Sequence, residues 1–302
     1  MYFESNGKVL LTAEYLVMDG AKALAFPSKL TQELYIENIN SNFIHWISLD
    51  ENKNVWYEEK FFRKEKSICY KGVKNDISEK IVCLFNHIHL SNDINDSLGK
   101  KFISKINFKR EWGLGSSSSL VNNLAKWSKV DPYKLLFTAF NGSGYDIACC
   151  DVKTPIVFNK IGKTINIENI KFNPTFKKNI FLIYRGKKQN TQNSILDYKK
   201  IKFDKNSAVN KINQLTNNII NCSSLSEFER LIESHESIIS KIINIKPIQK
   251  LNFKDYNNGV IKSLGSWGGD FILVTGDQKD LSYFKEKGYN TIYSISDLLY
   301  LS

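Results

Sequence analysis

The chain has 302 residues, of which 42% are hydrophobic and 13% aromatic, and its formal net charge at pH 7 is +11. The length suggests two domains, and the composition is that of a globular protein rather than a disordered one. No run of 18 apolar residues occurs, so we expect no membrane-spanning helix.

Lysines are spread along the chain and alternate with acidic or apolar residues even in the densest stretches, 53–66 and 177–188. This distribution favours a solvated surface over a nucleic-acid site, and a mild positive field would attract an anionic substrate. The first residues carry no signal-peptide pattern, and the five cysteines show no CxxC spacing. We therefore expect a cytoplasmic protein without zinc or disulfide bonds, and with no nucleic-acid or membrane partner.

The first half of the chain predicts mainly strands. Alternation through 8–12 predicts one strand, and several short β-rich runs separated by turns follow over 31–70. An apolar face at helical spacing predicts a helix over 77–90, and 101–109 alternates as a strand. A further helix over 132–140 begins with an aspartate N-cap and a proline at its first helical position.

The second half predicts strands combined with long helices. Apolar runs indicate the strands, and 3.6-residue spacing of apolar side chains indicates the helices. In chain order we expect a strand over 179–186, helices over 207–221 and 225–245, a strand over 271–275, a helix over 281–287 and a strand over 291–294.

The most informative segment is Gly113-Leu-Gly-Ser-Ser-Ser-Ser119, which lies between an expected strand and an amphipathic helix. Its glycines let the backbone turn tightly, and its small serines leave backbone N–H groups accessible to a ligand. Because unpaired N–H groups and the positive end of the helix dipole meet there, such a turn is typical of a phosphate site. A flexible linker, or serines that merely cap the helix, would explain the same residues.

Further glycine-containing segments lie at the ends of expected elements, at 7–8, 142–146 and 265–270. Each on its own is compatible with ordinary turn chemistry. Together with the glycine- and serine-rich turn, they suggest backbone segments that converge on one ligand.

The order and content of these segments resemble the GHMP kinase superfamily (galactokinase, homoserine kinase, mevalonate kinase, phosphomevalonate kinase) over essentially the whole chain. Residues 7–20 resemble its first motif, PGKVxLxGEYxVxxG, and 113–119 resemble its phosphate loop, GLGSSAS. Residues 142–146 match the PSGxD segment of mevalonate kinases, and 262–270 resemble the third motif, KxxGAGGGG. The string Gly144-Tyr-Asp-Ile-Ala148 marks a bacterial GYDIA-motif subgroup.

The resemblance implies an α+β protein with the two-domain GHMP kinase fold. A ribosomal-protein-S5-like α+β domain that holds ATP would span 1–172, and a ferredoxin-like domain would span 173–302. The strand–helix–helix–strand order that the second half predicts from its own residues agrees with this assignment.

The resemblance also implies a magnesium- and ATP-dependent kinase. Asp146 would be the catalytic base that takes a proton from the acceptor, and Lys8 would keep that aspartate charged. Ser117 would give its hydroxyl to Mg²⁺, which prefers oxygen ligands. The expected cofactor-binding residues are Gly113, Leu114, Gly115, Ser116, Ser117, Ser118 and Ser119. Those expected at the acceptor or in the third loop are Glu14, Gly144, Gly265, Ser266, Gly268 and Gly269. Ordinary turn, cap or strand-end roles remain alternatives, and Glu14 could either touch substrate or support the loop.

Departures from the superfamily pattern bear on the substrate. Mevalonate kinases carry a glutamate that binds Mg²⁺ about eleven residues before the catalytic aspartate, where this chain has Leu135. The third motif has Trp267 and Asp270 where glycines are common. We expect transfer of the γ-phosphoryl group to a hydroxyl or phosphate, with mevalonate or phosphomevalonate as the leading acceptor.

A kinase for a sugar or an amino-alcohol is the alternative within enzymes, and a catalytically silent nucleotide-binding homologue is the alternative outside them. The expected partners are ATP and a small-molecule acceptor. A homodimer is compatible with the sequence, although no exposed apolar stripe argues for one.

Overall fold

The computed structural model describes residues 1–93, 96–186, 191–267 and 270–302. The chain forms two compact units, which are not consecutive halves of the sequence. Unit 1 comprises Met1–Gly7, Leu30–Arg110 and Gly115–Asp151, and unit 2 comprises Lys8–Lys29, Glu111–Leu114 and Val152–Ser302. The expected boundary after residue 172 does not coincide with a boundary between these units, and it stays a prediction about domain families.

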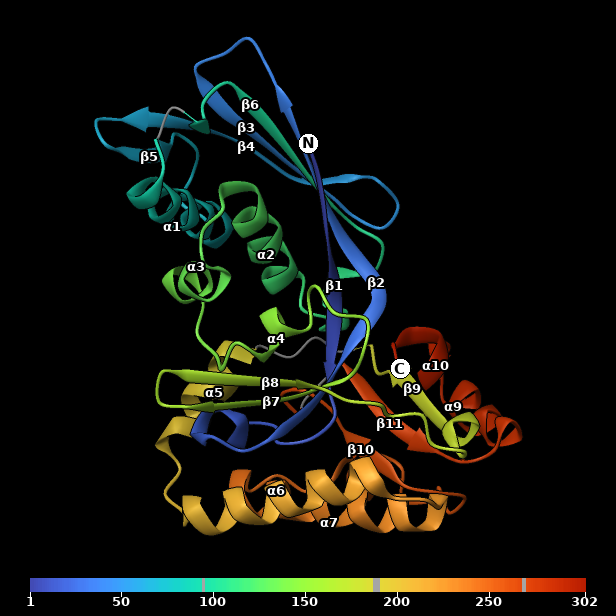
Figure 1. Ribbon diagram of the computed structural model, residues 1–302. Coiled ribbons are helices and arrows are strands. Elements are labelled where there is room, and N and C mark those ends of the chain that lie inside the picture. Colours follow the sequence, from blue (N-terminus) through green and yellow to red (C-terminus); the bar gives the residue numbers. More distant parts are fainter. Residues whose placement is uncertain (94–95, 187–190, 268–269) are drawn as a thin grey trace. The chain divides into compact units, whose positions relative to one another are not determined.

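Unit 1 is a sheet with helices on one face (Figure 1). The neighbouring strands follow the order β5-β4-β3-β6-β2, and all of these pairs are antiparallel except β3 with β6. The elements are β1 (Tyr2–Leu10), which belongs to unit 2 from Lys8 on, β2 (Ala23–Asn38), β3 (Phe43–Leu49), β4 (Val55–Lys64), β5 (Ser67–Tyr70), β6 (Lys100–Ile106), α1 (Asp76–Ser91), α2 (Ser116–Ser128), α3 (Pro132–Ala139) and α4 (Tyr145–Ala148). β1 pairs with β2.

Aromatic side chains fill the core between this sheet and its helices. Trp46 and Phe102, on neighbouring strands, stack with ring centroids 5.7 Å apart, and Phe85 of α1 meets the Trp46 ring edge-on. All three are completely or almost completely buried. Such contacts are favourable beyond the apolar area that they bury, so they tie α1 firmly to the sheet.

Unit 2 contains a second, antiparallel sheet in the order β10-β11-β9-β12. Helices α8 and α9 pack against it around Phe253 and Phe284, and α6 lies beside α7 (Figure 1). Its elements include β7 (Ile156–Ile161), β8 (Thr164–Asn169), β9 (Ile180–Tyr184), α5 (Thr191–Lys200), α6 (Lys205–Asn221), α7 (Leu225–Ile243), α8 (Ile248–Asn252), β10 (Ile261–Ser263), β11 (Phe271–Thr275), α9 (Leu281–Glu286), β12 (Ile292–Ser294) and α10 (Ile295–Leu298). Short 3₁₀ helices cover Leu16–Asp19, Arg110–Trp112, Lys177–Asn179 and Gln278–Asp280.

β2 belongs to both units. Its first residues, Ala23–Ala25, pair with β7 in unit 2, whereas Gln32–Asn38 pair with β6 in unit 1. A single long strand therefore carries the chain from the segment that contains the first motif into the sheet of unit 1.

The sequence-predicted elements are largely confirmed, with shifted ends. The helix expected over 225–245 ends at Ile243, because Asn244 adopts a left-handed conformation (φ 53°) and its N–H bonds back to the carbonyl of Ser240. The strand expected over 101–109 ends at Ile106. Helix α5 was not predicted; its sequence is polar and offers little apolar periodicity.

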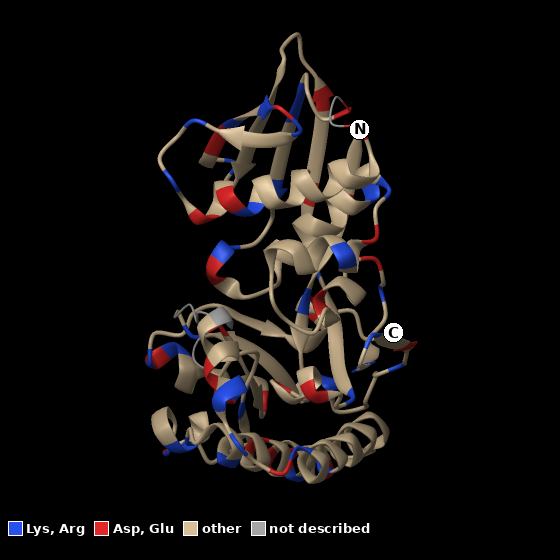
Figure 2. Cartoon of the chain, turned by 90° about the vertical axis from the view of Figure 1, so that its left-hand side faces the viewer, with Lys and Arg blue, Asp and Glu red and all other residues tan. Residues whose placement is uncertain are grey.

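Charged residues of both signs are interspersed in each unit (Figure 2), as the sequence predicts. In the described part of the chain, every helix is too short or too polar to cross a bilayer.

Candidate functional site

The N-terminus of α2 leaves backbone N–H groups without partners among the described residues. Gly115 precedes the helix in a left-handed conformation (φ 86°), which glycine adopts without the steric cost of a Cβ. The N–H groups of Ser118 and Ser119 both donate to the Gly115 carbonyl at 3.0 Å. No side chain caps this end, and the N–H groups of Ser116 and Ser117 have no acceptor among the described residues. Two backbone donors thus remain for a ligand at the positive end of the helix dipole.

The serines of the turn differ in what their side chains do. The Ser119 hydroxyl donates to Gln32 Oε1 at 2.6 Å, and the Gln32 amide donates to Ser104 Oγ at 2.7 Å. This buried chain anchors α2 to β2 and β6. Ser118 is also buried, whereas Ser117 is exposed. Of these side chains, Ser117 is therefore the best placed to reach a ligand.

Asp146 lies in the same unit as α2, on the short helix α4, which packs against α2. Gly144 begins α4 with φ 94°, and a Cβ there would lie 3.1 Å from two ring carbons of Tyr133. The left-handed φ favours glycine, and any larger residue would also require the Tyr133 ring to shift by a few tenths of an ångström. Asp146 is half-buried, whereas Tyr145 and Ile147 on either side are buried. The local fold therefore holds this carboxylate at the edge of the unit 1 core.

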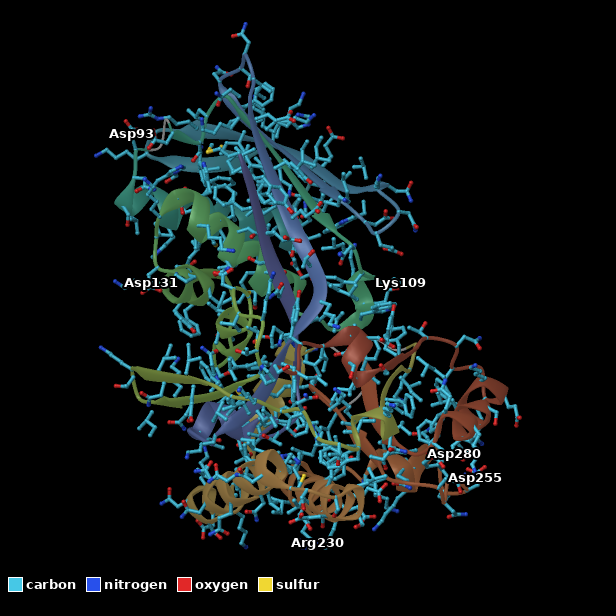
Figure 3. All side chains as sticks on the ribbon, turned by 45° about the vertical axis from the view of Figure 1, so that its right-hand side comes forward. Asp93, Lys109, Asp131, Arg230, Asp255 and Asp280 are labelled. Carbon is cyan, nitrogen blue, oxygen red and sulfur yellow. The ribbon has the colours of Figure 1, made fainter. Side chains whose placement is uncertain are left out.

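Helix α3 supplies no carboxylate at the position of the superfamily's metal-binding glutamate. Leu135 is 0% exposed and belongs to the hydrophobic core of unit 1. Asp131 lies at the start of α3 (Figure 3), where its side chain accepts hydrogen bonds from the N–H groups of Tyr133 and Lys134 at 2.8 and 3.2 Å. In the described part of the chain, no three His, Cys, Asp or Glu side chains gather in a metal-binding group.

Three of the predicted motifs meet in unit 2 at Gly113. Lys8 Nζ donates to the Gly113 carbonyl at 3.0 Å, and the Lys8 N–H donates to the Leu114 carbonyl at 2.9 Å. On its other side, Gly113 (φ 68°) faces Asp270, since a Cβ on this glycine would fall 2.3 Å from Asp270 Oδ2. The predicted pairing of Lys8 with Asp146 joins residues of different units and stays a prediction.

The third loop keeps a glycine-like backbone at residues that are not glycine. Trp267 has φ 59° and Asp270 has φ 42°, a region that costs an L-residue roughly 1–2 kcal/mol. Gly265 lies close to the Asp270 carboxylate, and the Ser266 carbonyl accepts a hydrogen bond from Tyr15 Oη at 2.9 Å. Gly268 and Gly269, also expected in this loop, lie outside the described residues.

Glu14 is completely buried, which favours a supporting role over contact with substrate. Its carboxylate accepts a hydrogen bond from Lys262, the first residue of the third motif. Burial raises the pKa of Glu14 to about 7, although the charge of Lys262 acts in the opposite direction. His235 and Glu236 of α7 adjoin this pair.

Sequence reasoning missed His235 and Glu236, although a signal was present. Both interrupt the apolar stripe of α7 formed by Phe228, Leu231, Ile232 and Ile239. A titratable residue at a core position of an amphipathic helix indicates a buried partner, because an unpaired buried charge is costly.

No protein-family model and no curated protein matches the sequence. Solved structures match over nearly the whole chain. Mevalonate kinase from Methanococcus jannaschii is 16% identical (TM-score 0.66), and the match covers 97% of this chain and 96% of that one. Streptococcus pneumoniae phosphomevalonate kinase, in complex with phosphomevalonate and AMPPNP, is 14% identical (TM-score 0.68), and the match covers 97% of this chain and 99% of that one. Lactococcus lactis galactokinase with galactose is 13% identical (TM-score 0.71), and the match covers 100% of this chain and 93% of that one.

These structures are GHMP kinases, and the chain has their two-domain α+β fold. The fold that the motifs predict is thereby confirmed. At this level of identity the likeness concerns the fold, so activity and substrate require a separate argument.

Proposed function

We propose that the chain is an ATP-dependent small-molecule kinase that transfers the γ-phosphoryl group to a hydroxyl or phosphate of its acceptor. The observation that carries this proposal is the start of α2, where the N–H groups of Ser116 and Ser117, after Gly115, find no acceptor in the part of the chain that the structure describes. The fold supports it, since one similar structure holds phosphomevalonate and AMPPNP and another holds galactose.

Phosphoryl transfer depends mainly on positioning and on neutralising charge. In this proposal the free N–H groups at the start of α2 hold ATP phosphates, and the small serines allow the approach. Mg²⁺, when bound, would neutralise phosphate charge. The exposed Ser117 hydroxyl suits this ion, because Mg²⁺ commonly takes one or two protein oxygens together with phosphates and water.

Asp146 is proposed as the group that accepts the proton of the acceptor hydroxyl. Its support is the residue match with the PSGxD segment and its position on α4, which packs against α2 within unit 1. Lys8 is proposed as its cationic neighbour, and the bond from Lys8 to Gly113 ties this lysine to the first residue of the phosphate loop.

Mevalonate and phosphomevalonate remain the leading acceptors, and a sugar or an amino-alcohol is the alternative. The Trp267 and Asp270 side chains enlarge the third loop and add a charge to it relative to glycine, so they bear directly on this choice. Leu135 is buried where a metal-binding glutamate is expected. This residue favours a catalytically silent nucleotide-binding homologue as the alternative to an enzyme. A cytoplasmic location and a homodimer remain expectations.

The test combines a binding measurement, an acceptor screen and a pair of variants. ATP with Mg²⁺ should raise the melting temperature of the protein, and an ATP-consumption screen over hydroxylated and monophosphorylated metabolites should identify the acceptor. Asp146→Ala should abolish turnover and leave the ATP-induced thermal shift intact, whereas Asp131→Ala, which removes a helix cap on α3, should retain turnover. ATP binding without transfer to any acceptor would support the silent homologue, and no ATP binding would contradict both.

A further inference from the structure

A cluster of titratable side chains lies buried in unit 2, away from solvent. Glu14, His235 and Lys262 are 0% exposed at their side chains, and Glu236 is 4% exposed. We call these four residues the charge network. They come from the turn after β1, from α7 and from β10. Burial of charged groups carries a desolvation cost of several kcal/mol per ion, which hydrogen bonds and ion pairs must offset. The partners in these bonds therefore identify the backbone segments that the network holds in place.

One part of the network holds the two residues that lead into the third loop. Lys262 Nζ donates to the Glu14 carboxylate and to the Ser263 carbonyl, the latter at 2.8 Å, and it lies 3.8 Å from Glu236 Oε2. Glu236 Oε1 accepts from the Ser263 N–H at 3.1 Å and from Ser263 Oγ at 2.9 Å. The backbone of Ser263 is therefore bonded through both its N–H and its carbonyl to network side chains.

The other part holds the turn that contains Glu14. The Ala13 N–H donates to His235 Nε2 at 2.9 Å, which assigns the neutral imidazole with its proton on Nδ1. Burial lowers the pKa of His235 well below its ordinary value, and the Lys262 charge acts in the same direction. Ala13 (φ 67°) and Tyr15 (φ 63°) both have a positive φ, which is rare for residues other than glycine, and such residues persist where their surroundings hold them.

The two parts are joined again beyond β10, since Tyr15 Oη donates to the Ser266 carbonyl of the third loop at 2.9 Å. We propose that Lys262 is a positioning residue, which holds the start of the third loop and the turn of residues 13–15 in one arrangement through Glu14 and Ser263. Apolar side chains of similar volume would fill the same space at equal or greater stability, but they would not bond these particular backbone atoms.

The loop arrangement can be measured without any kinase activity. In the full chain, Lys262→Met should increase hydrogen exchange of backbone amides at 263–267 and 13–15 by about tenfold or more, because their local opening becomes easier. Amides of 44–49 in unit 1 should keep the wild-type rate. The matched control is Lys287→Met, which removes a partly exposed lysine of the same unit from its 3.1 Å pair with Asp255; its exchange at 263–267 should equal that of the wild type.

A double variant separates positioning from stability. Glu14→Gln together with Lys262→Met leaves no unpaired Glu14 carboxylate in the core, so its melting temperature should exceed that of Lys262→Met alone. Exchange at 263–267 should nevertheless remain fast. The proposal would be overturned if the double variant regained slow exchange at 263–267. It would also be overturned if Lys262→Met raised the exchange rate uniformly over all of unit 2. If Lys262→Met does not fold, Glu14→Leu serves instead, because it removes the carboxylate that accepts a hydrogen bond from Lys262 Nζ, and unchanged exchange in that variant would equally overturn the proposal.

The consequence for catalysis rests on the proposed kinase function. Lys262→Met should lower kcat about tenfold and leave the KM for ATP within about twofold, because the phosphate-binding start of α2 lies in the other unit. If Lys262→Met had the same kcat as an active wild-type enzyme, the positioning role in catalysis would be contradicted. A wild-type protein with no transfer activity and a loop loosened by Lys262→Met would contradict the kinase proposal and leave the positioning role standing.

Discussion

The carboxylate of Asp270 lies against the Cα of Gly113, so closely that a Cβ on this glycine would be 2.3 Å from Oδ2 and 2.4 Å from Cγ of the aspartate. The third motif thus contacts the first residue of the predicted phosphate loop directly. Lys8 bonds to the carbonyl of the same glycine at 3.0 Å. A cation and an anion therefore approach one residue at the entrance to this loop.

Gly113→Ala should destabilise unit 2 and weaken ATP binding. The alanine would have to adopt the left-handed φ of 68°, at roughly 1–2 kcal/mol, and its Cβ would displace Asp270. We expect a melting temperature lower by several degrees and a smaller ATP-induced shift. Gly113→Ala combined with Asp270→Gly removes the clash and should recover part of the loss. A wild-type melting temperature for Gly113→Ala alone would contradict the observed contact.

Leu135→Glu should unfold or severely destabilise the protein rather than create a metal ligand. Leu135 is 0% exposed in the unit 1 core, and an unpaired carboxylate placed there would cost several kcal/mol. Lys134→Glu on the exposed side of the same helix is the matched control and should change stability by less than about 0.5 kcal/mol. Chemical denaturation of both variants provides the comparison. A stable Leu135→Glu protein with stronger Mg²⁺ dependence would show that this side chain can reach the nucleotide.

Local sequence patterns predict those parts of the candidate site whose conformation depends on residues adjacent in the sequence. Gly115 and Gly144 adopt left-handed conformations at helix starts, as glycines in such motifs commonly do. The helix that follows Gly115 and the aspartate cap of α3 are also readable from residue spacing. These features need no knowledge of distant contacts.

Other parts of the site depend on residues far apart in the chain. Glu14 and Lys262 are 248 positions apart, and no local pattern indicates that they pair. Trp267 and Asp270 lack the residue type that normally accompanies a positive φ, so their conformation depends on the surrounding fold. The division into two units also escapes sequence reasoning, because β2 contributes residues to both.

Two serines of the predicted phosphate loop should show opposite effects when replaced. Ser119→Ala leaves Gln32 Oε1 buried without its 2.6 Å donor, which should cost about 1–3 kcal/mol of unfolding free energy. Its ATP-induced shift should persist, because the backbone donors at Ser116 and Ser117 remain. Ser117→Ala, at an exposed position, should change stability by less than about 0.5 kcal/mol. It should instead reduce the additional shift that Mg²⁺ gives in the presence of ATP.

The measurement for both variants is thermal unfolding with ATP, with Mg²⁺, with both and with neither. A destabilised Ser117→Ala that keeps a full Mg²⁺ response would contradict the proposed metal role. A Ser119→Ala of wild-type stability would contradict the anchoring role of the Ser119–Gln32–Ser104 chain.

The stability that Glu14 contributes should decline as pH rises from about 4.5 to about 7. Burial raises the pKa of this carboxyl from 4.5 to about 7, so within this window the folded state binds a proton that the unfolded state has released. The unfolding free energy falls with pH wherever the folded state holds more protons. At about 1.4 kcal/mol per pH unit, the full decline would approach about 3 kcal/mol.

Neighbouring groups contribute to the same profile, so the comparison must isolate Glu14. Burial raises the pKa of Glu236 as well, which acts in the same direction, whereas the lowered pKa of His235 acts in the opposite one. Lys262 and Tyr15 are the other titratable side chains beside Glu14. We therefore predict the difference in unfolding free energy between wild type and Glu14→Gln, measured by denaturant titration from pH 4 to pH 8. The unfolding free energy of the wild type minus that of Glu14→Gln should fall as pH rises to about 7 and stay constant above that pH. A difference independent of pH would show that Glu14 keeps its ordinary pKa and is not held as the network requires.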